Sequence, residues 1–487
     1  WNLARGYGAS GQFDQGLTVI SQALERPDVG GPWRSRLRAL RARDLAFSDH
    51  RDQVRAEALL AISEGEQGGD GVSVGWGLVA LAADEAEPGE IRALTARALD
   101  ALVGDDPESL DLRTTLLVEQ LTPGFCSFDE FEAALPGAEA LATCAGTTAH
   151  LAQVQLVAAE RYFEAGDWDR SLVYLDQPGP LVALHHLLRW HGTAAVICAR
   201  RGNPAAADAH IAAVAGHAYA VGVQRLSAGR VIEARALLLE AAGDVTGAAR
   251  ALAEWLRHCH PGRGRDVYPE AIVETLRLAL QAGDRRTAES ALDVARAGVG
   301  ASPRADATAY VDLCQAMAAN SPTPMLHAAE LFEAAHARPM AALALEEAAV
   351  RLCERGDTVA ARTAFTRAAA VLEDLGASSD LRRLDDRLRR HGVRRGPRSY
   401  HRRPATGWEA LTRAELEIAR HVMRGLSNPE IAAQLFVSPR TVDAHVAQIL
   451  AKLAVRNRIE IAREVARHDD PTPIDPSSAS RHPDRGI

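Results

Sequence analysis

The segment Gly243-Asp244-Val245-Thr246-Gly247-Ala248 is the clearest copy of a short pattern that recurs along the chain. Each copy has a glycine, then Asp or Asn, and a small residue five places after the glycine; the other copies begin at Gly166, Gly202, Gly283 and Gly356. Glycine readily adopts the left-handed conformation that ends a helix, and Asp or Asn caps the helix that follows. Each copy therefore predicts a turn between two antiparallel helices, and the small residue lets them approach closely.

The spacing of these copies predicts a repeat. Their glycines are 36, 41, 40 and 73 positions apart, the last interval being about two periods, and Gly11-Gln12-Phe13-Asp14 looks like an earlier copy. Residues 1–380 are rich in Ala, Leu, Arg and Glu and lack the β-branched alternation of strands. We therefore predict an all-α stack of helical hairpins. It resembles the tetratricopeptide class, although its periods exceed ~34 residues and the Trp, Tyr and Pro landmarks are largely missing.

Two segments do not fit the period, Glu64–Gly77 and Thr122–Gly146, so we expect a possible subdivision near 122–146. Solenoids commonly bind a partner on their inner surface. We therefore interpret residues 1–380 as a sensor or interaction region for an unknown effector or protein, with a plain spacer as the alternative. Trp168, Trp190 and Trp255 are expected to be core residues rather than a ligand cage.

The composition argues against an enzyme. The 487 residues include 55 Lys and Arg, but Lys452 is the only lysine, and there is no G-x-x-x-x-G-K-[ST] segment to hold nucleotide phosphates. We therefore expect no cofactor in this chain, and ATP only if a nucleotide-binding module precedes Trp1.

The six cysteines are dispersed without zinc-ligand spacing, and no apolar run reaches the ~18 residues of a membrane helix. These features predict a cytoplasmic protein with no membrane partner, nucleoid-associated when bound to DNA.

The formal net charge of -9 hides an uneven distribution. Residues 1–380 carry a net -17, residues 381–468 a net +10 and residues 469–487 a net -2. Most of the positive charge lies in residues 381–404, where ten arginines face two aspartates, and we interpret this segment as an Arg-rich linker beside a DNA reader. Residues 469–487 are predicted to be a disordered tail.

Residues 405–468 contain four helix-start signals. Thr412 with Glu415, Ser427 with Glu430, Ser438 with Pro439, and Asn457 with Glu460 each predict the beginning of a short helix. In the third helix Val442, Val446, Ile449 and Leu453 form one apolar stripe. The opposite face carries small and polar side chains suited to the major groove of DNA: Arg440, Asp443, Ala444, Ala447 and Gln448.

Asp443 is unusual on such a face, because phosphates repel a carboxylate unless it accepts a hydrogen bond, for example from cytosine N4. Lys452, Arg456 and Arg458 lie at helix ends, where backbone phosphates would pass. A helical bundle that binds no nucleic acid is the alternative. The complete set of candidate DNA-binding residues is Ser427, Asn428, Ser438, Arg440, Thr441, Asp443, Ala444, His445, Ala447, Gln448, Lys452, Arg456, Asn457 and Arg458.

The order of these residues resembles the LuxR-type helix-turn-helix domain. The resemblance is carried by Leu411–Ile418, Gly425–Ala432, Leu435–Val446, Lys452-Leu453 and Asn457-Arg458. It implies that residues 427–435 form a positioning helix, that residues 438–453 form the recognition helix, and that the fourth helix helps to form a dimer. It also implies that Thr441, His445, Lys452, Asn457 and Arg458 make or support backbone contacts, although His445 can equally be a half-buried structural histidine.

This sequence departs from the family at several positions. The family commonly has a basic residue where Asp443 stands, so base readout is not carried over there. Ala414 replaces a usual Arg, while Ala419 and His421 replace bulky apolar residues. A helical-repeat region ending in such a domain is similar to the large ATP-binding, MalT-like LuxR regulators.

We therefore expect a sequence-specific transcription regulator, and an activator, whose repeat region controls the C-terminal DNA reader. The expected partners are double-stranded promoter DNA, a second copy of the chain on DNA, RNA polymerase and the unknown effector. The alternative is an interaction scaffold whose terminal bundle does not read DNA.

Overall fold

The computed structural model is entirely helical in the residues it describes, which confirms the predicted fold class. The described residues are 1–9, 12–48, 50–85, 88–104, 106–123, 125–144, 148–176, 184–216, 227–259, 268–299, 306–394, 407–435 and 439–469. The chain divides into two compact units, a repeat unit (Trp1–Ser399) and a C-terminal unit (Tyr400–Ile487). No helix within the described ranges is long and apolar enough to cross a membrane.

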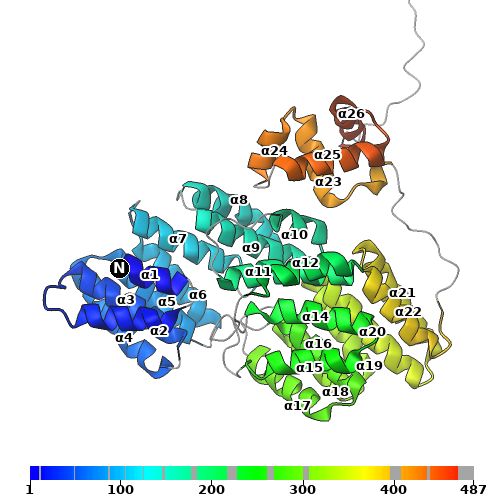
Figure 1. Ribbon diagram of the computed structural model, residues 1–487, viewed down its shortest axis with the longest axis horizontal. Coiled ribbons are helices and arrows are strands. Elements are labelled where there is room, and N and C mark those ends of the chain that lie inside the picture. Colours follow the sequence, from blue (N-terminus) through cyan, green and yellow to red (C-terminus); the bar gives the residue numbers. More distant parts are fainter. Residues whose placement is uncertain are drawn as a thin grey trace, which may run out of the picture. The chain divides into compact units, whose positions relative to one another are not determined.

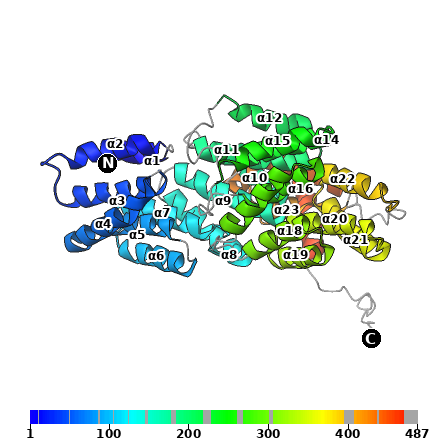
Figure 2. The same ribbon diagram turned by 90° about the horizontal axis from the view of Figure 1, so that it is seen from below.

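The first half of the repeat unit consists of helices packed successively on one another, as Figure 2 shows for α2 to α6. Its helices are α1 (Asn2–Ala9), α2 (Phe13–Leu24), α3 (Pro32–Ala46), α4 (Val54–Gly68), α5 (Gly71–Asp84), α6 (Pro88–Ala101), α7 (Pro107–Gln120), α8 (Phe128–Cys144), α9 (Thr148–Ala165) and α10 (Trp168–Tyr174), with a 3-10 turn η1 (Arg51–Gln53).

The second half continues as helical hairpins (Figure 1). Its helices are α11 (Leu184–Arg200), α12 (Pro204–Val214), α14 (Gly229–Ala241), α15 (Val245–Leu256), α16 (Pro269–Ala282), α17 (Arg285–Val294), α18 (Ala307–Ala318), α19 (Pro322–Ala334), α20 (Arg338–Glu354), α21 (Thr358–Asp374) and α22 (Ser378–Arg389), with a π-helical turn η2 (Ala295–Val299).

The five predicted turns have the expected geometry. Gly166, Gly202, Gly243, Gly283 and Gly356 all have φ between 73° and 90°. In each case the side chain of the following Asp or Asn accepts a hydrogen bond from a backbone amide of the next helix, as Asp244 does from Gly247 at 2.8 Å. The small residues five places after these glycines are buried. The pattern therefore encodes the hairpins in the way that the sequence predicts.

The long interval between Gly283 and Gly356 contains a sixth turn without glycine. Asn320 has φ of 51°, Ser321 precedes α19, and Pro322 is the first residue of that helix. Asn320 lies 37 positions after Gly283 and 36 before Gly356, which restores the period. Asparagine tolerates the left-handed conformation better than most residues other than glycine. The sequence motif missed this copy because it required glycine at the first position.

One expectation for the first half needs correction, and another falls partly outside the described residues. The segment Glu64–Gly77 was expected to fall outside the hairpin pattern, but Gly69, with φ of 65°, separates α4 from α5 there. In the expected early copy, Gly11 lies outside the described residues, and Gln12 begins α2 without a side-chain cap. The buried cluster of α1 to α7 ends at Leu116, and a separate cluster begins at Leu121.

The tryptophans are core residues, as predicted. Trp168, Trp190 and Trp255 are each no more than 1% exposed. The indole N–H groups of Trp168 and Trp190 donate to the backbone carbonyls of Phe163 and Leu175 at 3.1 and 3.0 Å. The polar atoms of these two rings are therefore satisfied inside the fold, whereas the buried Trp255 Nε1 has no hydrogen-bond partner among the described residues.

The Arg-rich segment is not a linker from its first residue. Residues 381–389 belong to α22, whose Leu384 and Leu388 are fully buried in the repeat core. Arg383 Nη2 lies 2.9 Å from Glu346 Oε2, and Arg387 Nη1 lies 2.7 Å from Glu346 Oε1 and also pairs with Glu347. The composition of the segment did not indicate that these two arginines neutralise buried carboxylates of α20. Residues 395–404 lie outside the described residues.

Candidate nucleic-acid interface

The C-terminal unit is a small helical bundle with its own apolar core. Its elements are a 3-10 turn η3 (Trp408–Ala410), α23 (Arg413–Met423), α24 (Asn428–Gln434), α25 (Pro439–Leu453) and α26 (Arg458–Asp469). Side chains of all four helices are buried in one cluster: Leu411, Ile418, Ala419, Val422, Ile431, Ala432, Val442, Ile449, Ile461 and Val465. This core fixes the helices relative to one another.

Local sequence sets where the first two helices begin. Thr412 and Glu415 form a reciprocal capping box at α23, with the Glu415 carboxylate 2.7 Å from the Thr412 amide. Ser427 and Glu430 form a second box at α24, and Gly425 between these helices has φ of 83°. Both boxes are as predicted. The third predicted cap, Ser438, lies outside the described residues.

The two faces of α25 differ as its sequence pattern predicts. Val442 and Ile449 are fully buried, and Val446 and Leu453 pack against the same core. The opposite face consists of exposed residues: Arg440, Asp443, Ala444, Ala447 and Gln448. Because two of the five are alanines, the helix surface is shallow there, and another surface can come close to its backbone. The apolar stripe thus orients the opposite face of α25 outward.

Asp443 belongs to a hydrogen-bonded chain that joins three helices. The Asn428 side chain donates to Asp443 Oδ1 at 2.7 Å, from the start of α24 to α25. Arg458, the first residue of α26, donates through Nη1 to Asn428 Oδ1 at 3.4 Å and through Nη2 to the backbone carbonyl of Leu426. Asn428 and Arg458 therefore hold the positioning helix against its neighbours, and the carboxylate of Asp443 has a protein donor.

Lys452 has a structural partner that the sequence prediction missed. Its Nζ lies 2.7 and 2.8 Å from the two carboxylate oxygens of Glu415, which is 1% exposed. The ammonium thus neutralises a buried carboxylate that already caps α23. The signal was available in the sequence, because the glutamate of a capping box is held at a known position and its charge needs a partner.

The remaining candidate DNA-binding residues differ in burial and in their hydrogen-bond partners. Asn457 donates to Glu460 Oε1 at 3.0 Å and accepts from the Glu460 amide at 3.1 Å, so it caps α26. Thr441 and His445 are half-buried, and both interact with other groups of the protein. Arg456 is exposed, and its backbone amide, rather than its side chain, bonds to Glu460 at 2.8 Å.

Stacking of Trp408 on His468 is a further contact that the sequence pattern did not predict. The ring centroids are 4.4 Å apart with an interplanar angle of 11°, so the two ends of the bundle touch. Trp408 packs against the apolar core of the unit, whereas His468 is exposed. An aromatic residue just before the first capping box was the only indication of it.

The positive surface of this unit depends on where its charged side chains lie rather than on its net charge. Residues 407–469 contain nine basic and eight acidic side chains. Three of the acids are committed to helix starts, and the hydrogen bonds from Ser427 lower the pKa of Glu430. Within the part of the unit that the structure describes, Arg440 and Arg456 are exposed and no carboxylate pairs with either side chain. Arg424 and Arg463 are also exposed, but of these cations Arg440 lies on α25 and Arg456 lies in the loop directly after it.

Comparisons with known proteins agree on the C-terminal unit. The family model described as "Bacterial regulatory proteins, luxR family" matches residues 409–465. The HTH-type transcriptional regulator Rv0890c of Mycobacterium tuberculosis (strain H37Rv) is 45% identical over 75 residues, which are 15% of this chain and 8% of that protein. The transcriptional regulatory protein UhpA of Escherichia coli K12 is 40% identical over 57 residues, 12% of this chain and 29% of that protein. The matched segment is thus a small part of each relative.

A monomeric IFIT1 mutant solved with m7Gppp-AAAA is similar over 80% of this chain and 88% of that chain, with 14% sequence identity and a TM-score of 0.39. The capping boxes, the buried stripe of α25 and the family match all concern the same 57 residues. Residues 409–465 are a LuxR-family helix-turn-helix domain, which in this chain follows an all-helical, tetratricopeptide-like repeat region.

Proposed function

We propose that this chain is a sequence-specific DNA-binding regulator of transcription, in which α25 reads promoter DNA. The observation that supports the proposal most is the exposed face of α25, whose shallow alanine centre is flanked by Arg440 and Gln448. A helix with this surface fits the major groove, where Arg and Gln side chains can reach phosphates or base edges. Arg456, at the end of the loop after α25, adds a second cation for the DNA backbone.

Asn428, Asp443 and Arg458 have a different part in this proposal. Their hydrogen-bonded chain fixes the angle between α24 and α25, which decides how deeply α25 enters the groove. Asp443 keeps one carboxylate oxygen for its Asn428 donor and offers the other to a base donor such as cytosine N4. Lys452 acts through Glu415 and the stability of the bundle rather than through phosphate.

The regulatory part of the proposal concerns the repeat unit. An effector or protein partner binds the repeat unit and favours one arrangement of the chain, so the DNA reader changes its affinity or its pairing with a second copy. Such control requires two states that the effector binds unequally. The proposal has three further parts. The chain activates transcription through RNA polymerase, it forms a dimer on DNA, and it catalyses no reaction.

DNA binding is tested with the full chain and fluorescently labelled promoter fragments, by anisotropy over a series of salt concentrations. A DNA reader shows affinity that falls linearly with the logarithm of salt concentration, because bound phosphates release counterions. A scaffold that does not read DNA shows no saturable, salt-dependent binding to any fragment. That result would overturn the proposal.

A further inference from the structure

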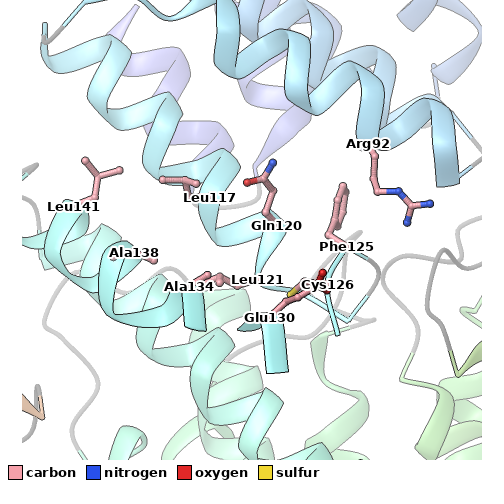
Figure 3. Close-up of a pocket in the computed structure, with 11 residues that line it drawn as sticks. Arg92, Leu117, Gln120, Leu121, Phe125, Cys126, Glu130, Ala134, Ala138 and Leu141 are labelled. Atoms are coloured by element: carbon pink, nitrogen blue, oxygen red, sulfur yellow. The ribbon is translucent and has the colours of Figure 1, made fainter. Parts of the chain in front are cut away.

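A pocket of about 700 Å³ lies in the repeat unit between α6, α7 and α8 (Figure 3). It occurs where the buried cluster ending at Leu116 gives way to the one that begins at Leu121. The pocket also overlaps the segment 122–146, which departs from the helical period. Its volume is in the range of small-molecule sites, and the place between two cores is where such sites commonly form.

The walls of the pocket are mainly apolar. Leu117 of α7, and Leu121 directly after that helix, face Ala134, Ala138 and Leu141 of α8. The α8 residues share one face of that helix, and Gly137 between them also lines the pocket, so α8 presents little side-chain volume to α7. Figure 3 shows Leu141 and Ala138 at one end of the pocket and Phe125 at the other. The space is therefore elongated, with an apolar body.

The pocket has two charged side chains, Glu130 and Arg92, and they differ in whether the protein already binds their charge. Glu130 Oε2 accepts hydrogen bonds from the Ser127 amide at 2.8 Å and the Ser127 hydroxyl at 2.9 Å, and these bonds lower its pKa. Its charge is thus committed to the start of α8. Arg92 lies beside Phe125 in Figure 3, and among the described residues no carboxylate pairs with it. The uncommitted charge at the pocket is therefore positive and lies at one end.

We propose that this pocket binds an elongated, apolar small molecule that carries one terminal anionic group, such as a carboxylate. The apolar body lies between Leu117 and Ala138, and the anion meets the guanidinium of Arg92 beside Phe125. In the regulatory scheme proposed above this molecule is the effector, and only that role rests on the proposed function. Binding itself requires neither DNA nor the C-terminal unit.

The test uses the full chain and three alkyl probes of equal length: decanoate, decan-1-ol and decyltrimethylammonium. Each displaces 8-anilinonaphthalene-1-sulfonate, whose fluorescence reports occupancy of an apolar site. Decanoate is expected to bind about tenfold more tightly than decan-1-ol, the effect of a charge-assisted contact with one arginine. Equal affinity for the three probes would overturn the proposal.

Matched variants locate the site. Arg92→Gln is expected to remove the preference for decanoate, whereas Arg97→Gln, on an exposed position of the same helix, retains it. Ala134→Trp fills the pocket and is expected to abolish binding of every probe, whereas Ala133→Trp, exposed and not part of the lining, binds as the wild type does. Circular dichroism confirms that each variant is folded. Unchanged binding by a folded Ala134→Trp chain would contradict the assignment.

The same titrations distinguish this proposal from the regulator proposal, because they contain no DNA. The absence of a decanoate preference in the wild-type chain overturns the pocket assignment and leaves DNA reading untouched. A chain that binds decanoate but no promoter fragment supports the pocket assignment while overturning the proposed function.

Discussion

The guanidinium of Arg200 lies 3.1 Å from the carboxylate of Asp380, although the two residues are 180 positions apart in the chain. Arg200 is the last residue of α11 and also pairs with Glu233 and Glu274 at 3.1 and 2.8 Å. Ser378, the first residue of α22, donates to the Arg201 carbonyl at 2.6 Å. Helix α22 thus contacts α11, so the last helix of the second half of the repeat unit is bonded to the first helix of that half.

Asp380→Asn is expected to destabilise the repeat unit by about 3 kcal/mol, because Arg200 and Arg383 each lose one of their buried carboxylate partners. Urea unfolding measures the loss, and amide hydrogen exchange of α22 locates it. Asp386→Asn is the matched control on the same helix, since its pair with Arg389 is exposed and contributes little. Equal stability of the two variants would show that the ion pairs of Asp380 do not stabilise the packing of α22.

Asn320 provides a test of the sixth hairpin turn. Asn320→Val is expected to lower the free energy of unfolding by about 1 to 2 kcal/mol, because a β-branched residue fits the left-handed conformation poorly. Asn320→Gly keeps that conformation accessible and is expected to be neutral within a few tenths of a kcal/mol. Thermal unfolding compares the two variants. A valine variant as stable as the glycine variant would contradict the turn.

Asp44 makes the stability of the first helices depend on pH. Burial raises its pKa to about 6, against the opposing effect of Arg43. A raised pKa means that the folded state prefers the protonated form, so this contribution to stability is complete below the ordinary pKa of 3.8 and is lost as the pH rises through about 6.

Asp44→Asn is therefore expected to stabilise the chain at pH 7, on the order of 2 kcal/mol, and to have a smaller effect at pH 5. Denaturant unfolding at the two pH values measures the difference. Asp100→Asn, an exposed carboxylate on α6, serves as the control. A variant whose advantage is the same at both pH values would contradict the raised pKa.

Lys452 and Arg456 were both predicted to lie where backbone phosphates pass, but in the structure Lys452 pairs with Glu415 and Arg456 is exposed. Lys452→Met is expected to destabilise the C-terminal unit by about 2 kcal/mol, because it leaves the buried Glu415 carboxylate without its cation. Faster amide exchange in α23 and α25 is the readout. Arg456→Gln is expected to leave exchange unchanged while reducing the salt slope of DNA binding by about one. If Lys452→Met lowers the salt slope and leaves exchange unchanged, Lys452 contacts phosphate instead.

Local signals in the sequence predicted the turns and caps well, because a glycine, an Asp or a capping box acts within a few residues. Gly243 with Asp244, and Thr412 with Glu415, are examples whose geometry follows from the sequence alone. Contacts between distant residues were not predictable in this way. Nothing near Arg383 indicates that Glu346 lies beside it, and composition alone does not show that its helix packs into the repeat core.

The candidate site shows the same limit. The exposed face of α25 followed from helical periodicity, since burial of Val442 and Ile449 fixes which side chains point outward. The partners of Lys452 and Asp443 depend on how α23 and α24 pack against α25, which periodicity does not specify. The pocket at α6 to α8 was likewise visible in sequence only as a segment that departs from the period.

The central claim, that the exposed face of α25 reads DNA sequence, is tested most directly by selection from a pool of random duplexes. The full chain is expected to enrich one motif, Gln448→Ala to change the preferred base at one position of it, and Arg456→Gln to enrich the same motif with lower affinity. Enrichment of no motif, or the same effect of both substitutions on every sequence, would contradict the account.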